Sequence, residues 1–224
     1  MNRLAASSAA PPDDPPAVHR VLLADVAPQP WRNGGGLTRE LLAWPAGAAA
    51  WQLRVSVAEI RRDGPFSVFA GVQRCFQVLS GAGVVLGAGA AARRLTPADA
   101  PWAFNGATGL DCQLLDGPTL DLNLMVQEVA GAAAMQPCRA GEPLPAGPRW
   151  RGLFTTTPLC WQAGQAAPQR LPAMSLLWSD TDTTRPWRVW HEPATPGATP
   201  EPTALRAWWL SLSAAPPARP DPTA

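Results

Sequence analysis

The sequence of 224 residues contains no lysine and no tyrosine, so all 18 of its basic residues are arginines. Without lysine the chain cannot form a Schiff base at a lysine amine or a phosphate-binding loop of the type G-x-x-x-x-G-K-[ST]. Without tyrosine no phenol can act as a general acid or base. The composition alone therefore excludes several common catalytic schemes.

Histidine is nearly as scarce, because the chain has only His19 and His191. A metal site built from several histidines of one chain is excluded on this count. The nucleophile motif G-x-S-x-G is absent, and neither histidine lies near a serine or cysteine in a known triad pattern. We therefore expect both histidines to be ordinary edge or surface residues, with no metal and no cofactor bound.

The four cysteines, Cys75, Cys112, Cys138 and Cys160, are widely spaced and contain no C-x-x-C pair. Neither a zinc knuckle nor a redox dithiol is supported, and we expect the cysteines to be small buried apolar residues. The net charge of +1 offers no field that would gather nucleic acid or an anionic membrane. No apolar run reaches 18 residues, and the first 16 residues do not resemble a secretory signal, so a cytoplasmic protein is expected.

Proline and glycine are abundant, at 27 and 19 residues. The prolines gather near the start, after His191 and at the end. We therefore expect disordered tails at 1–17 and 214–224, and an exposed Pro-rich insertion near 192–203.

Between these regions, strand signals recur about every 8–12 residues, and no long stretch has an apolar period of 3.6 residues. This pattern predicts an all-β sandwich or barrel. Segment 80–83 is expected to join a hairpin, and 128–152 to be a connection with a short helical turn. The expected strands are 18–26, 37–42, 51–58, 66–69, 75–79, 84–86, 102–105, 110–115, 120–126, 150–156, 159–162, 174–178, 187–190 and 207–212.

Three consecutive glycines, Gly34 to Gly36, follow Trp31. The run lacks the last glycine of G-x-G-x-x-G and precedes an expected strand, so it does not predict a dinucleotide site. Two interpretations remain: a tight turn that uses positive φ, or a close approach of the backbone to a ligand. Trp31 is the best candidate for an aromatic wall of such a pocket.

Two expected strands carry polar residues on one face. Arg54 and Ser56 share the face opposite an apolar one, and Asp121 and Asn123 share a face of another strand. If these faces line a barrel, Arg54 is partly buried and needs an anionic partner. That partner could be Glu40, Glu59 or Asp121, or the carboxylate of a ligand; alternatively, both faces point to solvent.

The motifs together resemble the HutD/Ves family. The segments that carry the resemblance are W-R-N-G-G-G-L-T-R-E at 31–40, W-x-x-R-x-S-x-A-x-I at 51–60, D-G-P-F-S-x-F-x-G at 63–71, L-S-G-x-G at 79–83 and D-x-N-x-M at 121–125. They lie within residues 28–126, whereas the second half matches only in its general β character. Ala70 departs from the family's usual proline, and the insertion after His191 leaves the boundaries of the second half open.

The resemblance implies a bicupin fold, with one cupin-like barrel over 18–118 and a second over 119–213. It also implies a small-molecule-binding protein with a regulatory role linked to histidine utilisation, and urocanate or formylglutamate-like carboxylates as ligands. Many cupins hold a metal through clustered histidines, which this chain lacks, so a metal-free cupin is expected. Carried onto this sequence, the ligand-binding residues are Trp31, Asn33, Gly34, Gly35, Thr38, Arg54, Ser56, Phe66, Arg74 and Asn123.

Three hypotheses follow. In the first, Arg54 and Asn33 hold the carboxylate of a small metabolite, with no nucleic acid and no membrane as partner. In the second, the protein is a cupin-type isomerase or hydrolase with Glu40, Glu59 or Asp121 as the base. In the third, it is a partner-binding protein without a ligand that uses a Trp-rich surface; a homodimer is left open.

Overall fold

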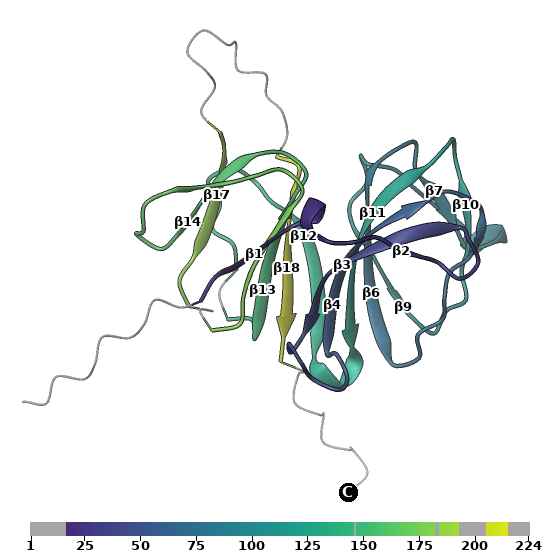
Figure 1. Ribbon diagram of the computed structural model, residues 1–224, viewed down its shortest axis with the longest axis horizontal. Coiled ribbons are helices and arrows are strands. Elements are labelled where there is room, and N and C mark those ends of the chain that lie inside the picture. Colours follow the sequence, from purple (N-terminus) through teal and green to yellow (C-terminus); the bar gives the residue numbers. More distant parts are fainter. Residues whose placement is uncertain (1–16, 146, 182–183, 193–204, 215–224) are drawn as a thin grey trace, which may run out of the picture.

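Two antiparallel β barrels lie side by side in this protein (Figure 1). The computed structural model describes residues 17–145, 147–181, 184–192 and 205–214. The expected tails and the Pro-rich insertion lie almost wholly outside these ranges. Each barrel consists of a larger and a smaller antiparallel sheet, which confirms the all-β prediction.

The first barrel pairs a six-stranded sheet, in the order β2-β3-β4-β11-β6-β9, with a four-stranded sheet, in the order β5-β10-β7-β8. Its strands are β2 (Gln29–Pro30), β3 (Gly36–Trp44), β4 (Leu53–Ile60), β5 (Gly64–Pro65), β6 (Val72–Ser80), β7 (Val84–Leu86), β8 (Arg93–Leu95), β9 (Trp102–Asn105), β10 (Asp111–Leu114) and β11 (Thr119–Gln127).

The second barrel pairs a five-stranded sheet, in the order β1-β16-β13-β18-β12, with a three-stranded sheet, in the order β15-β14-β17. Its strands are β1 (His19–Leu22), β12 (Ala132–Pro137), β13 (Trp150–Thr155), β14 (Leu159–Ala163), β15 (Gln169–Leu171), β16 (Ser175–Ser179), β17 (Trp187–His191) and β18 (Ala207–Ser213). Short 3₁₀ turns occur at η1 (Leu23–Asp25), η2 (Gly89–Ala91) and η3 (Glu128–Ala130).

The two larger sheets pack against each other and bury a core that is shared by both barrels. On β4, the apolar residues Leu53, Val55 and Val57 point into this shared core. They meet side chains such as Trp150 of β13 and Leu210 of β18 from the second barrel. Because successive side chains of a strand point to opposite faces, the intervening residues of β4 point into the first barrel.

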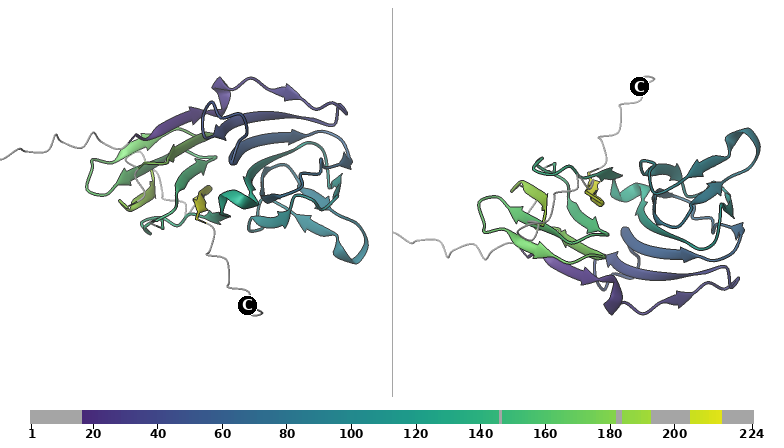
Figure 2. Two further views of the ribbon diagram at one scale, coloured as in Figure 1. Left: turned by 90° about the horizontal axis from the view of Figure 1, so that it is seen from below. Right: turned by 90° about the horizontal axis from the view of Figure 1, so that it is seen from above.

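The strand pairing differs from the division at residue 118 in two places. Strand β11, which lies beyond that boundary, is a central strand of the first barrel. Strand β1 belongs instead to the second barrel, where it pairs with β16 (Figure 2). Strand β1 therefore lies in the second barrel, β2 to β11 form the first barrel, and β12 to β18 complete the second.

The expected hairpin at 80–83 is wrong, because β6 and β7 belong to different sheets. Gly81 and Gly83 have φ values of +90° and +108°, which favour glycine. A Cβ on Gly83 would lie 2.2 Å from the carbonyl oxygen of Leu95. The segment is a tight crossing between the two sheets of the barrel.

The expected strand at 66–69 is also wrong, since these residues form a loop. The backbone N–H of Phe66 donates to the Leu110 carbonyl, and that of Phe69 donates to the Gly106 carbonyl. Phe66 and Phe69 direct their rings to the same side chain, Arg74, whereas residues three apart in a strand point to opposite faces.

All four cysteines are free thiols. Cys75, Cys112 and Cys138 are buried as expected, and burial raises the pKa of Cys75 to about 11 and those of Cys112 and Cys138 to about 12. Over the described ranges, no helix is long and apolar enough to cross a membrane.

Candidate functional site

A buried polar cluster lies on the inner face of the six-stranded sheet of the first barrel. The register places Ser56 of β4 directly opposite Asn123 of β11. The next inward row runs from Arg54 through Met125 to Arg74 of β6. The interior interpretation of these faces is therefore confirmed, and the solvent-facing alternative is wrong.

Arg54 forms an ion pair with a glutamate of the protein itself. Its Nε donates to Oε2 of Glu40 at 2.6 Å, and its Nη1 lies 3.9 Å from the sulfur of Met125. The side chains of Arg54 and Glu40 are 20% and 36% exposed, so solvent reaches this pair. Glu59, the other glutamate considered, pairs with Arg61 instead. Of the alternatives open from the sequence, Glu40 is the direct partner of Arg54.

We expect the Arg54–Glu40 pair to add modestly to stability. A double-mutant cycle with Arg54→Gln and Glu40→Gln should give a coupling energy of about 0.5–1 kcal/mol, because solvent screens a partly exposed pair. The Arg139–Glu142 pair, whose side chains are 80% and 61% exposed, serves as the control and should give a smaller coupling. Urea unfolding measures both cycles, and equal couplings would contradict the claim that partial burial strengthens the first pair.

Arg74 is the most enclosed cation of the cluster, at 7% exposure. Three phenylalanine rings surround its guanidinium, with centroids 5.1 Å (Phe66), 5.8 Å (Phe69) and 5.0 Å (Phe104) from Cζ. Such contacts stabilise a cation whose hydration has been lost. Burial lowers the pKa of Arg74 to about 10, still far above neutral pH, so the side chain remains charged.

The hydrogen bonds of Arg74 are incomplete. Its Nη2 donates to Oδ1 of Asn123 at 3.0 Å, and its Nη1 contacts the Ser67 carbonyl at 3.4 Å. Its Nε is buried and has no partner. A buried N–H of a charged group without an acceptor is costly, so this atom marks a position where an acceptor is missing.

Asp121 is the buried carboxyl group of the cluster, at 1% exposure. Its Oδ1 accepts a hydrogen bond from Nδ2 of Asn123, whereas its Oδ2 has no partner. Burial raises the pKa of Asp121 well above its ordinary value, against the opposing effects of the Arg74 charge and the Asn123 hydrogen bond. The carboxyl group is therefore a candidate carrier of a proton.

The glycine-rich loop forms a tight turn between β2 and the start of β3. The Nε1 of Trp31 donates to Oγ1 of Thr38 at 2.7 Å, and Oδ1 of Asn33 accepts from the N–H of Gly35 at 2.9 Å. Gly34 has a φ of +68°. A Cβ on Gly36 would lie 2.4 Å from the Glu59 carbonyl oxygen. The loop is therefore a tight turn, as one of the two interpretations predicted. Its third glycine, Gly36, packs directly against the backbone of β4.

Asn33 and Arg54 lie far apart in the structure. Gly36 lies opposite Ile60, at the far end of β4. Arg54 is six residues (60 − 54) away along that strand, which at about 3.3 Å per residue is ~20 Å. The hypothesis that Arg54 and Asn33 hold one carboxylate is therefore corrected, because the two lie at opposite ends of the barrel.

The ten expected ligand-binding residues divide into two groups. The inner group is Arg54, Ser56, Phe66, Arg74 and Asn123. The loop group is Trp31, Asn33, Gly34, Gly35 and Thr38. Sequence reasoning missed the aromatic walls Phe69 and Phe104, although the first is part of the F-S-x-F motif and the second lies opposite Arg74. Asp121 was considered as a partner of Arg54 and as a possible catalytic base, but not as a ligand-binding residue.

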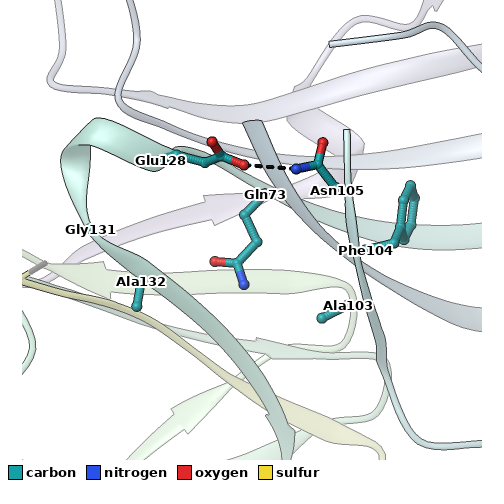
Figure 3. Close-up of a pocket in the computed structure, with 7 residues that line it drawn as sticks. All are labelled: Gln73, Ala103, Phe104, Asn105, Glu128, Gly131 and Ala132. Atoms are coloured by element: carbon teal, nitrogen blue, oxygen red, sulfur yellow. Dashed lines mark hydrogen bonds between the residues drawn. The ribbon is translucent and has the colours of Figure 1, made fainter. Parts of the chain in front are cut away.

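A groove of about 440 Å³ lies elsewhere, where the two barrels meet (Figure 3). Across it, Asn105 Nδ2 donates to Glu128 Oε1 at 3.0 Å. Phe104 borders the groove, but the inner polar residues do not line it. We place the candidate site at the inner cluster, because two charged side chains there, Arg74 and Asp121, each have a buried polar atom without a partner. The groove is lined by Gln73, Ala103, Phe104, Asn105, Glu128, Gly131 and Ala132.

The histidines lie in the second barrel, away from this cluster. His19 stacks on Trp178 with ring centroids 4.2 Å apart, and His191 is the last residue of β17. In the parts of the chain that the structure describes, no three residues among His, Cys, Asp and Glu gather as a metal site would require.

Comparisons with known proteins place the chain in a family. The HutD family matches residues 23–189. An uncharacterized 21.2 kDa protein in the hutC 3' region of Pseudomonas putida is 42% identical over 45% of this chain and 54% of its own length. Protein Ves from Citrobacter koseri is 35% identical over 43% of this chain and 51% of its own length. The chain thus spans about half the length of these curated relatives.

The structure of HutD from Pseudomonas fluorescens SBW25, in a formate condition, extends the likeness to both barrels. It is 26% identical, with a TM-score of 0.73 over 89% of this chain and all of the other. Because the family match over residues 23–189 covers more than half of the chain, this chain belongs to the HutD family.

Proposed function

We propose that the first barrel binds a small carboxylate anion at Arg74, with Arg54 as a second cation. The observation that carries the proposal is the unpaired Nε of a guanidinium that is almost fully buried. A carboxylate supplies the missing acceptor and a charge-assisted hydrogen bond. Ser56 and Asn123 flank the position, and the surrounding phenylalanines provide apolar walls.

The proposed ligand class is a carboxylate of histidine degradation, such as urocanate or a formylglutamate-like compound, bound in a regulatory role. Two relatives support this class. The Pseudomonas putida relative is described by its place in a hutC region, and the structure of the Pseudomonas fluorescens HutD is of a formate condition. Formate is accordingly a suitable minimal probe.

Calorimetric titration with urocanate, N-formylglutamate and formate tests the proposal. We expect the wild-type protein to bind at least one of them. Arg74→Gln should weaken binding by about 10- to 150-fold, since a hydrogen bond to a charged group contributes about 1.5–3 kcal/mol. Arg54→Gln should have a smaller effect, because Glu40 already engages this cation.

Arg170→Gln is the matched control, since Arg170 is exposed and pairs with Glu192 in the second barrel. This variant should bind as the wild type does. No binding by the wild-type protein, or equal losses in Arg74→Gln and Arg170→Gln, would overturn the proposal.

A second candidate function rests on Asp121. Its raised pKa and unpaired Oδ2 suit a general acid or base for an isomerase or hydrolase. Turnover of urocanate or N-formylglutamate that is lost in Asp121→Asn would support an enzyme. Binding without turnover would leave the binding function alone.

A further inference from the structure

We propose that Asp121 takes part in anion binding as a neutral carboxylic acid, so that the first barrel takes up a carboxylate together with a proton. This inference rests on the proposed function and specifies the chemistry of the same site. It makes Asp121 a hydrogen-bond donor to the ligand.

The geometry around Asn123 supports this role. Its amide bridges the two charged groups, since Oδ1 accepts from Arg74 and Nδ2 donates to Asp121. Both partners nevertheless retain one buried polar atom without a hydrogen bond, Nε of Arg74 and Oδ2 of Asp121. We infer that a ligand carboxylate bridges them, accepting from Nε of Arg74 and, provided that Oδ2 carries a proton, from Asp121 as well.

Electrostatics favours that proton once an anion is present. Asp121 and a bound carboxylate would share the charge of Arg74, and two carboxylates at one site raise the pKa of one of them. Burial already raises the pKa of Asp121 in the free protein. A neutral acid that donates to an oxyanion is an established arrangement in apolar sites.

The other charged and titratable groups near Asp121 do not replace it. Arg54 of β4 lowers the pKa of Arg74 but is itself paired with Glu40 of β3. Cys112 of β10 remains a neutral thiol, with its pKa raised to about 12 by burial and by Asp121. Asp63 acts on Cys112 and is exposed, with Oδ1 bonded to the Leu114 N–H. Asp121 is therefore the group at this position whose neutral form is favoured by burial, and it is the one that can gain a proton when an anion binds.

Proton uptake determines the direction in which the binding affinity changes with pH. The complex holds a proton on Asp121, so binding should weaken as pH rises through the pKa of Asp121 in the free protein. Above that value Kd should rise about tenfold per pH unit, and uptake should approach one proton per anion. In Asp121→Asn the amide donates without titrating, so binding should persist and lose this pH dependence.

Two measurements test the inference on the full chain with the tightest-binding of the three probes above. Carbon-13 NMR of side-chain carboxyl groups reports whether Asp121 is protonated in the complex, with Asp121→Asn identifying its signal. Calorimetry in buffers of different ionisation enthalpy, from pH 5.5 to 8.5, counts the protons taken up. Asp116→Asn, at an exposed position, is the control and should behave as the wild type does.

The outcomes separate the two proposals. No binding of any probe by the wild-type protein overturns the proposed function. Binding with an ionised Asp121 in the complex overturns the inference alone, whatever the pKa of the free protein. A protonated Asp121 in the complex, together with persistent binding by Asp121→Asn, supports the inference.

Discussion

Trp150→Ala is expected to lower the free energy of unfolding by about 3–5 kcal/mol, because it removes a fully buried indole from the core that the two barrels share. Trp150 stacks on Trp178 with centroids 6.4 Å apart, and its ring covers Gly152, where an added Cβ would lie 2.5 Å from the indole. Both barrels contribute to this core, so we expect one cooperative transition at a lower urea concentration.

Trp51→Ala is the matched control, since Trp51 is only half-buried. It should cost clearly less than Trp150→Ala. Urea denaturation followed by circular dichroism measures both variants. Equal costs, or a Trp150→Ala variant in which one barrel unfolds separately while the other keeps its full stability, would contradict a shared core.

Gly36→Ala is expected to lower the free energy of unfolding by about 3 kcal/mol. The new Cβ would lie 2.4 Å from the Glu59 carbonyl oxygen and 3.1 Å from the ring of Trp31. Overpacking of this kind costs about 1–3 kcal/mol, and the upper end applies because a backbone oxygen of a paired strand cannot easily move. Thermal unfolding measures the effect.

Gly35→Ala provides the comparison, because its Cβ would meet only the side chain of Asn33, at 3.2 Å. That side chain can shift, so the loss should stay below about 1 kcal/mol. If the two variants were equally stable, the third glycine of the motif would not be a packing requirement between β3 and β4.

Alternation was the most reliable signal in the sequence. The pattern of 51–58 predicted both the apolar face of β4, which enters the shared core, and the polar face, which lines the first barrel. The family motifs predicted the two barrels. By contrast, β12 was missed, because Ala132–Pro137 has low intrinsic β propensity and is a strand through its pairing with β18.

Other features depend on distant contacts that no local pattern encodes. The glycines of 80–83 suit a hairpin and a crossing equally well, and only the neighbouring backbone of Leu95 decides between them. The distance from Asn33 to Arg54 depends on register, which the sequence does not state. The importance of Asp121 depends on burial and on one unpaired oxygen.

Strand order also has a consequence for synthesis on the ribosome. His19 of β1 lies opposite Trp178 of β16, and β18 is an interior strand of the same sheet. At about 5–20 residues per second, roughly 8–30 s separate the translation of β1 from that of β16. During that interval the emerging β1 has no sheet to join. The strands of the first barrel leave the ribosome earlier, but the apolar core that its large sheet shares with the second barrel is complete only after Leu210 and Leu212 of β18 have been synthesised.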